Sequence, residues 1–414
     1  MLMTIPYMIG GLSSLWGTVT AGLTDTGSDL SWAMFGILGM AWFFGRHKED
    51  AVDTEESSRA ASPAPMPLSS VEAPDKTSEL VDQMLSQGRF ALLLRPQISS
   101  GLDEDHFRRA LAALEDSMGL VPDGNVTLEQ SARGAGDNPY EGGDGTPVTT
   151  RVVSVERLFL DRYPVTNQRF HEFVEAGGYE QMTLWDETIW TAIFDMVDQT
   201  GMPGPRYWKD GTYLPGEEDH PVVGVNWYEA NAYARWVGKR LPSDAEWVKA
   251  GSWPIAVSAN TTKQRKYPWG DSMEIERANV WGSATGRICP VDSFSEGVSV
   301  GGIYQLVGNV WEWNGGTYRL DADTAKQAVL STPLKSIRGG AYDTYFENQA
   351  SCQFQSGEDP LSRRHNIGFR CAIGVCDLSL TQPSARESSS ADLSSTEAEP
   401  RDDSAFVKSG EVSA

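Results

Sequence analysis

Hydrophobic positions are densest at the beginning of this chain, in residues 1–48. Two apolar stretches, residues 5–24 and 30–45, flank the only two acids of the first 45 residues, and no Lys or Arg lies among them. Each stretch is close to the roughly 17–25 residues that a helix needs to cross a bilayer. The pattern predicts a membrane anchor of two transmembrane helices. One spanning helix preceded by an interfacial segment is the alternative.

The basic residues Arg46 and Lys48 follow the second stretch directly. Lys and Arg gather on the cytoplasmic side of membrane helices. With two helices, we therefore expect the main part of the chain to lie in the cytoplasm, whereas a single helix leaves the orientation open.

Two further segments are polar and acidic. Residues 49–77 and 377–414 are rich in Ser, acids and, in the first segment, Pro. Segments with so few hydrophobic residues cannot bury enough apolar surface to fold. We predict a flexible acidic linker over the first and a disordered acidic tail over the second.

Residues 78–120 show the spacing of apolar positions that indicates helices. The first helix is capped by Thr77 or Ser78, and the second runs from about Leu102 to Met118. The segment is predicted to be a short helical hairpin that packs on the main body or contacts a partner.

Helical periodicity becomes sparse over residues 121–376. Two helices are predicted there, one over residues 165–178 and one over residues 226–241. Elsewhere Gly, Pro, Trp and Tyr separate short apolar runs, and aromatic residues at this density serve chiefly as buried anchors for long loops. The pattern predicts an α+β domain rich in irregular loops.

Charge and composition narrow the functional classes. The formal net charge is −23 and the sequence pI is about 4.6, so the surface repels phosphate backbones and nucleic-acid binding is not expected. The chain has four cysteines and five histidines, without a CxxC or an HxxxH pair. A zinc site or a CxxC redox motif is therefore not predicted.

Seven motifs then follow one another in the order of a known family: FLDRYPVTNQRFHEFV, HPVVGVNWYEANAYARWVGKRLPSDAEWVKAG, YPWGD, ANVWG, YQLVGNVWEW, IRGGAY and NIGFRCA. Over residues 145–376 the chain resembles the formylglycine-generating enzyme (sulfatase-modifying factor) family. This resemblance implies an α+β domain of the C-type-lectin-like kind, with little regular secondary structure. The N-terminal segments and the tail lie outside it.

The resemblance also implies two cysteines shortly after a double glycine, which hold copper and oxidise a substrate cysteine. The segment here is AYDTYFENQA, with Asp343 or Thr344 in the place of the first cysteine and Ala341 in the place of a hydroxyl residue that assists the reaction. A carboxylate or hydroxyl cannot replace a soft thiolate as a ligand for Cu(I). We therefore predict a divergent member without formylglycine-generating activity, and we expect no copper.

The cysteines that remain fit this interpretation. By the resemblance, Cys352 and Cys371 fall at positions where secreted relatives form disulfides, and their usual partner positions hold Ala234 and Gly251. These bridges cannot form, which agrees with a reducing compartment.

Two structural calcium sites are further implied by the resemblance, since Ca²⁺ accepts both carboxylate and carbonyl oxygens. The first set is Asn279, Val280 (backbone), Asp292 and Phe294 (backbone). The second set is Gln305, Gly308, Val310 and Glu312. Gln305 stands where the family usually has Asn or Asp. The alternative is that Asn279 and Asp292 only stabilise turns.

Another branch of the family uses non-haem iron held by three histidines. The histidines of this chain show no ligand spacing, so iron is not expected. A branch that resembles pyoverdine-maturation factors lacks the cysteine pair and is still implicated in peptide maturation. For that branch, the residues of a rebuilt site here would be Asp343, Trp311 and His365.

The segment EDPLSRRHN places Arg363, Arg364 and His365 next to the position of the absent cysteines. Arginine forks suit carboxylates, so these residues are candidates for holding an acidic peptide; a solvated loop is the alternative. Two functions follow. The first is a membrane-anchored, non-catalytic scaffold or protein-interaction subunit of a membrane-associated complex. The second is a maturation enzyme with a rebuilt, cysteine-free site.

Overall fold

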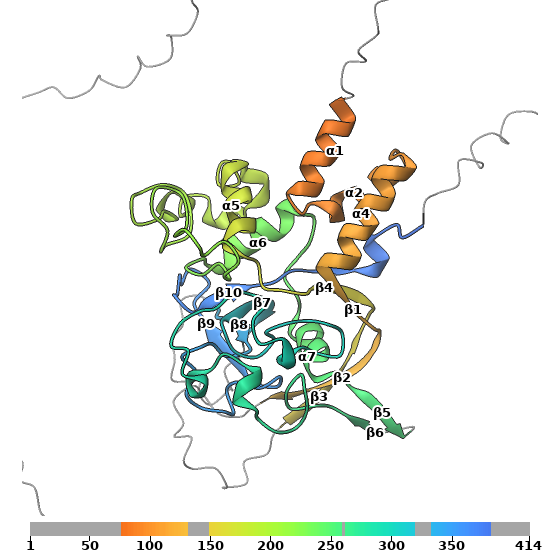
Figure 1. Cartoon of the computed structure of the whole chain (residues 1–414), viewed down its shortest axis with the longest axis vertical. Helices are drawn as coiled ribbons and strands as arrows, with labels where there is room; N and C mark the ends of the chain where they lie inside the picture. The colour runs from red at the N-terminus through yellow and green to blue at the C-terminus, as the bar shows by residue number, and fades with distance from the viewer. Residues whose placement is uncertain (1–75, 131–148, 259–260, 319–332, 382–414) are drawn as a thin grey trace, which may run out of the picture. The chain divides into compact units, whose positions relative to one another are not determined.

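The computed structural model of the chain describes residues 76–130, 149–258, 261–318 and 333–381 (Figure 1). The predicted membrane anchor, nearly all of the predicted linker and most of the predicted tail lie outside these residues. Among the residues described, no helix is long and apolar enough to cross a membrane.

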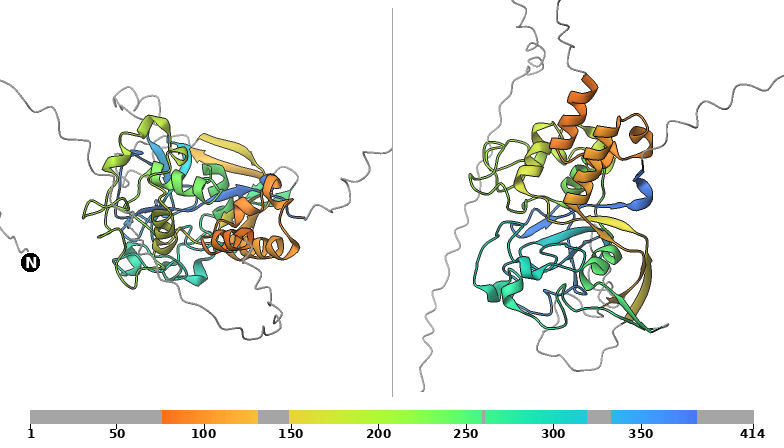
Figure 2. Two further views of the ribbon diagram at one scale, coloured as in Figure 1. Left: turned by 90° about the horizontal axis from the view of Figure 1, so that it is seen from above. Right: turned by 45° about the vertical axis from the view of Figure 1, so that its right-hand side comes forward.

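Four helices precede the first strand: α1 (Lys76–Ser86), α2 (Phe90–Leu93), α3 (Pro96–Ser99) and α4 (Glu104–Ser117). The two predicted helices correspond to α1 and α4, and two single-turn helices connect them. Helix α4 begins at Glu104 because the Asp103 carboxylate accepts the backbone N–H of His106 at 2.8 Å. Figures 1 and 2 show α1, α2 and α4 together at one end of the described body.

This helical segment packs on the domain that follows it. One hydrophobic cluster joins both parts: Phe90, Leu93, Leu94, Phe107, Leu114, Phe159, Ile373 and Leu378. Arg95 donates to the Gly238 carbonyl at 2.8 Å, and the Ser379 N–H donates to the Leu94 carbonyl at 2.8 Å. Two predicted boundaries therefore need correction, since residue 120 falls inside a strand and the first residues after 376 belong to the packed body.

A three-stranded antiparallel sheet closes the domain, in the order β1 (Met118–Val121), β4 (Leu158–Asp161) and β11 (Ala372–Gly374). Strand β4 is central, so it joins the strand after the helical segment to the last strand of the chain. Segments more than 200 residues apart in sequence thereby form one sheet.

A second sheet has the order β10 (Ile367–Phe369), β7 (Trp311–Thr317), β8 (Lys335–Arg338) and β9 (Gln355–Glu358). Strands β10 and β7 are parallel, and the other pairs are antiparallel. Two hairpins complete the described strands: β2 (Gly124–Gln130) with β3 (Thr149–Val155), and β5 (Ile255–Ser258) with β6 (Thr261–Lys263).

The two predicted helices of the domain are present and shorter than expected: α5 (Asn167–Glu175) and α6 (Trp227–Trp236). A further helix, α7 (Asp244–Ser252), follows them. Thr166 caps α5, and Asn226 and Ser243 each form a capping box with the glutamate three residues later. Short 3₁₀ turns fill many loops: Met182–Leu184, Glu187–Ile189, Ile193–Asp195, Ile275–Arg277, Trp281–Ser283, Ser295–Gly297 and Val375–Asp377. The α+β prediction with irregular loops is confirmed.

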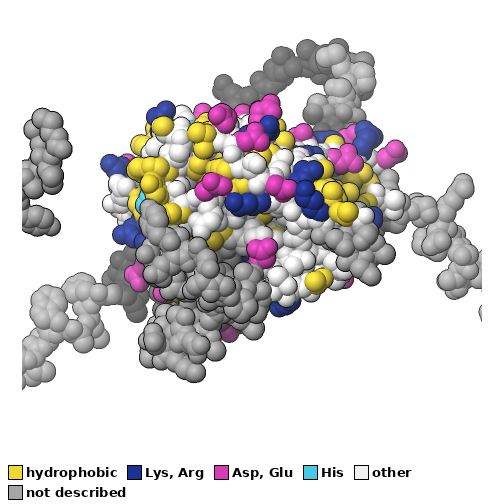
Figure 3. Space-filling view, turned by 90° about the horizontal axis from the view of Figure 1, so that it is seen from below, with side chains coloured by type: hydrophobic (Ala, Val, Ile, Leu, Met, Phe, Trp, Pro, Cys, Tyr) yellow, Lys and Arg dark blue, Asp and Glu magenta, His cyan; other side chains and the backbone are white. Residues whose placement is uncertain are grey.

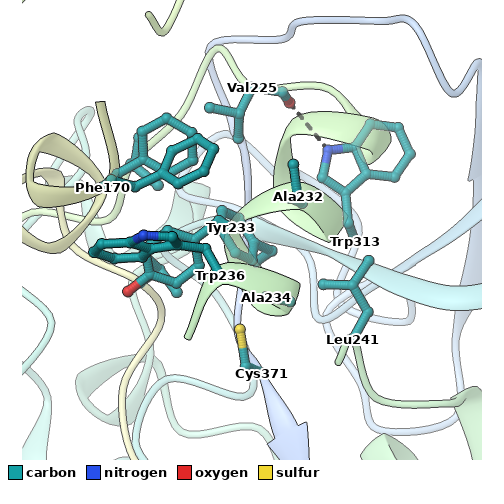
Figure 4. Packing of buried hydrophobic residues seen from close by; sticks show 14 of the residues in the cluster. Phe170, Val225, Ala232, Tyr233, Ala234, Trp236, Leu241, Trp313 and Cys371 are labelled. Carbon is teal, nitrogen blue, oxygen red and sulfur yellow. Dashed lines mark hydrogen bonds between the residues drawn. The ribbon is translucent and has the colours of Figure 1, made fainter. Parts of the chain in front are cut away.

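Aromatic side chains dominate the largest core. Phe170 and Tyr233 stack with their ring centroids 5.6 Å apart, and Trp236 lies in the same cluster (Figure 4). The Trp313 indole N–H donates to the Val225 carbonyl at 3.1 Å, which satisfies its polar end inside the core. This core holds α5 and α6 against the second sheet.

Candidate functional site

The frame around the double glycine is intact. Gly339 and Gly340 both have positive φ angles, and a Cβ at Gly339 would lie 2.7 Å from the Leu306 carbonyl oxygen, so only glycine fits there. Arg338 is buried and its Nε donates to Asp244 at 2.5 Å. Asp244, the first residue of helix α7, therefore also orients the strand that leads into this loop.

The three residues proposed for a rebuilt site lie near one another. The distance from His365 Nε2 to Asp343 Oδ2 is 3.4 Å. The Asn366 amide donates to both oxygens of the same carboxylate, at 3.1 and 3.0 Å. Because β7 and β10 are parallel partners, the Trp311 N–H donates to the Asn366 carbonyl at 2.9 Å. Asp343 is thus oriented by an amide and placed beside a half-exposed imidazole.

An exposed aromatic group, which no sequence motif indicated, continues from this loop. Trp281 and Tyr345 contact each other with ring centroids 6.2 Å apart, and Tyr345 contacts Phe346 at 5.2 Å. Trp281 is 61% exposed and Tyr345 65% exposed. Ile275 lies against the backbone of Gly282, next to Trp281. We call Ile275, Trp281, Tyr345 and Phe346 the aromatic surface.

Hydrophobic side chains are exposed between acidic and basic ones on the face of the molecule seen from below (Figure 3). The sequence predicts buried anchors for its Trp and Tyr residues, so an exposed one is not distinguished from the others. The signal that was available is the three aromatic residues of YDTYF, in the loop where the resemblance implies cysteines.

The predicted partner-binding residues separate into two environments. Arg363 is largely covered, with 10% of its side chain exposed, and it pairs with the fully buried Glu229 at 2.9 Å. Its guanidinium also donates to the carbonyls of Gly224, Val197 and Gly204. Arg363 is therefore a structural residue and cannot hold a peptide, because its donors are already engaged inside the protein.

Its neighbours in the sequence are at the surface. Arg364 is exposed and its Nε lies 3.1 Å from Glu358, while His365 is exposed beside Asp343. Glu358 largely neutralises Arg364. This loop therefore presents little net positive charge to an acidic peptide.

The first predicted calcium set lies around a serine. Ser283 Oγ donates to the Val280 carbonyl at 2.7 Å and lies 3.3 Å from Asn279 Oδ1. The Asn279 amide donates to the Arg287 carbonyl and to Asn309. Asp292 is exposed. These oxygens suit Ca²⁺, and an ion would compete with the Ser283 hydroxyl for two of them. The first set remains a prediction.

In the second predicted calcium set, the charged residue Glu312 already accepts hydrogen bonds inside the protein. The Glu312 carboxylate accepts from Arg370 at 2.6 Å and from the Trp247 indole N–H at 2.7 Å. Gln305 donates to the Pro290 carbonyl and accepts from Asn309. The Gly308 carbonyl accepts the N–H of Val310. Calcium would have to displace a buried ion pair, so these residues do not fit it as they stand.

All four cysteines are free thiols. Cys352 and Cys371 are completely buried. Burial raises the pKa of Cys352 to about 12 and raises that of Cys371 well above its ordinary value. Thiols held in the protonated form do not bind Cu(I) readily. The partner positions implied by the resemblance lie close by, since Ala234 shares the core of Cys371 (Figure 4) and Gly251 faces Cys352.

Replacing Gly251 with cysteine is expected to form a disulfide with Cys352 under oxidising conditions. A Cβ at Gly251 would lie 3.6 Å from the Cys352 Cβ, which is within the range of about 3.5–4.5 Å found in disulfides. The bond should stabilise the oxidised protein by about 2–4 kcal/mol. Mass spectrometry of a non-reducing digest and urea unfolding measure both effects.

Gly251→Ser is the matched control, because it adds a side chain of similar size that cannot form the bond. Equal unfolding midpoints for the oxidised Gly251→Cys and Gly251→Ser variants, without a linked peptide, would contradict the pairing.

Comparisons with known proteins identify one matching family and several similar proteins. The family described as "Sulfatase-modifying factor enzyme 1-like domain" matches residues 105–375. The hercynine oxygenase of Mycolicibacterium thermoresistibile is 36% identical over 260 residues, covering 58% of this chain and 55% of that protein. The serine/threonine-protein kinase Pkn1 of Chlamydia trachomatis is 33% identical over 253 residues, covering 59% of this chain and 37% of that protein.

A third relative is the inactive C-alpha-formylglycine-generating enzyme 2 of Bos taurus, which is 31% identical over 274 residues, covering 58% of this chain and 84% of that protein. The chain spans little more than half of the hercynine oxygenase and about a third of the kinase. These names describe different activities, so the shared domain does not determine what the chain does. The family match over residues 105–375 shows that the chain belongs to the sulfatase-modifying factor enzyme 1-like family.

Proposed function

We propose that this chain is a non-catalytic protein-interaction subunit, held at a membrane by its N-terminal residues. The observation that carries the proposal is the loop after the double glycine. Where the resemblance implies a copper-binding pair of thiols, this loop contributes Tyr345 and Phe346 to an exposed aromatic surface. The double glycine that shapes the loop is present, whereas aromatic side chains stand in the loop where the resemblance implies thiols.

Two properties of the thiols argue against oxidation of a substrate cysteine. No cysteine lies in the loop over residues 341–350. Cys352, the nearest in sequence, is buried and has a raised pKa, so it does not supply a thiolate. Copper-dependent formylglycine formation would need both a second thiol and a reachable one.

The aromatic surface has the composition of a protein interface. Trp and Tyr are enriched among the residues that carry most binding energy, and exposed apolar side chains that contact one another mark interaction sites more often than single ones do. The membrane anchor and its cytoplasmic orientation remain predictions from residues 1–48. They would concentrate the domain next to membrane-associated partners.

Purification of the full chain from membranes in mild detergent tests this proposal. We expect stoichiometric partner protein with the wild type, and at least about tenfold less with the double variant Trp281→Ala/Tyr345→Ala. Phe194→Ala is the matched control, because Phe194 is an exposed aromatic residue outside the aromatic surface. Recovery of the wild type alone and monomeric would overturn the proposal.

A second candidate function, a peptide-maturation enzyme with a rebuilt site, is favoured by one observation. Asp343 is oriented by Asn366 and lies beside His365, which is the arrangement of a carboxylate that positions a general base. Elemental analysis of the purified protein tests for a metal-dependent enzyme of this kind. We expect neither copper nor iron, and one equivalent of either metal would favour the enzyme.

A further inference from the structure

The aromatic surface and the Asp343 loop form one continuous part of the molecule. The ring centroids of Tyr342 and His365 lie 6.2 Å apart, and Asp343 pairs with the same histidine. The next residue, Thr344, accepts the backbone N–H of Trp281 at 3.3 Å. A single loop therefore joins the position of the absent thiols to the aromatic surface.

Acidic residues surround this surface. Residues 271–296 contain five acids and two arginines, and residues 342–349 contain two acids and no base. Arg277 pairs with Glu274 at 2.7 Å and with Glu296 at 3.7 Å, so it does not offset the remaining acids. Exposed acids lie in both segments: Glu276 and Glu274 in the first, and Glu347 in the second. Glu347 pairs with Lys266 at 3.4 Å and accepts from the Tyr267 hydroxyl at 2.7 Å, so Glu276 carries the exposed acid charge that has no described partner on this surface.

Aromatic faces and carboxylates attract the same kind of ligand. The ring quadrupole of Trp or Tyr binds an arginine or lysine side chain, and carboxylates around the ring strengthen the attraction and repel acidic segments. The segment EDPLSRRHN offers little to an acidic peptide, because Arg363 is engaged internally and Arg364 pairs with Glu358.

We propose that the aromatic surface docks a basic, arginine-containing segment of the partner protein, with an arginine on the Trp281–Tyr345 pair and acids on its rim. This inference rests on the proposed interaction function and names the chemistry of its partner. The segment is expected to combine arginine with apolar residues, because Ile275 and Phe346 extend the contact beyond the two rings.

The test uses the full chain in detergent and two fluorescein-labelled twelve-residue peptides. One alternates arginine with leucine, and the other alternates glutamate with leucine. Fluorescence anisotropy should show binding of the arginine peptide at least about tenfold tighter than that of the glutamate peptide. Trp281→Ala should weaken the arginine peptide about tenfold, whereas Phe194→Ala should leave its affinity unchanged.

A matched pair of charge variants excludes general attraction to an acidic protein. Glu276→Gln/Glu347→Gln removes two acids at the surface, and Glu104→Gln/Asp105→Asn removes two from the first turn of helix α4. Only the first pair should weaken binding and reduce its salt dependence. Equal effects of both pairs, or no effect of Trp281→Ala in a protein with unchanged thermal unfolding, would overturn the inference.

Failure of this inference differs from failure of the proposed function. If a partner co-purifies through the aromatic surface but the arginine peptide shows no preference, the partner chemistry is wrong and the interaction function stands. If nothing co-purifies, the interaction function itself fails.

Discussion

Replacing Arg370 with methionine is expected to lower the free energy of unfolding by about 3–5 kcal/mol. Arg370 is completely buried and Glu312 is 1% exposed, and their closest N–O distance is 2.6 Å. The guanidinium also donates to the carbonyls of Asp161, Arg162 and Tyr304. Methionine fills a similar volume, but it leaves the Glu312 carboxylate buried without a counter-charge. Urea unfolding followed by tryptophan fluorescence measures the loss.

The double variant Arg370→Met/Glu312→Gln is the control. It removes the uncompensated charge and keeps a group that accepts from the Trp247 indole, so it should lose clearly less stability than Arg370→Met alone. If the single and double variants unfold at the same urea concentration, the charge on Glu312 is not what the arginine stabilises. In that case the lost bonds to the three carbonyls account for the effect.

The second large effect is expected at the centre of the aromatic core. Phe170→Ala should lower the free energy of unfolding by about 3–5 kcal/mol, because Phe170 is completely buried and its truncation leaves a cavity. Its ring contacts four others, at centroid distances of 5.2 to 6.2 Å: Phe173, Trp208, Tyr233 and Phe369. These rings belong to different elements and cannot all move to fill the space.

Phe194→Ala is the comparison, because it makes the same substitution at an exposed phenylalanine. Phe194 is 79% exposed, so the same substitution should change the free energy of unfolding by less than about 0.5 kcal/mol. Thermal unfolding of both variants beside the wild type measures the difference. Equal losses would mean that Phe194 is covered by something in the full protein, and a small loss at Phe170 would mean that the core repacks.

Elements whose signals are local were predictable. Thr166, Asn226 and Ser243 each stand one residue before a helix and hold its first turn with their own side chains. Such caps act over three residues, so they are visible in the sequence. The helix ends were predicted less well. Helix α6 stops at Trp236, five residues before the end expected from its pattern, because Gly238 takes a left-handed backbone conformation and Arg240 then pairs with Ala372 of β11.

The candidate site was predictable where it depended on residue type and not where it depended on burial. The absence of thiols after the double glycine is a fact of the sequence, and the prediction that the chain lacks formylglycine-generating activity needed no coordinates. The neighbourhood of Asp343 and His365 was expected, but Asn366, which orients the carboxylate, was not. Trp281 was missed because no local pattern distinguishes an exposed tryptophan from buried ones such as Trp247 and Trp313.

Arg363 and Arg364 show most clearly what could not be predicted from the sequence alone. They are adjacent and chemically identical, and no pattern within the segment EDPLSRRHN distinguishes them. Residues brought in from other parts of the chain do so: Glu229 and three carbonyls surround the first, and solvent surrounds the second. Residue types, caps and the missing thiols were determined by the sequence alone, since they involve one residue or its close neighbours. Burial, charge pairing and the exposed aromatic surface were decided by the tertiary structure, because each depends on contacts between residues far apart in the chain.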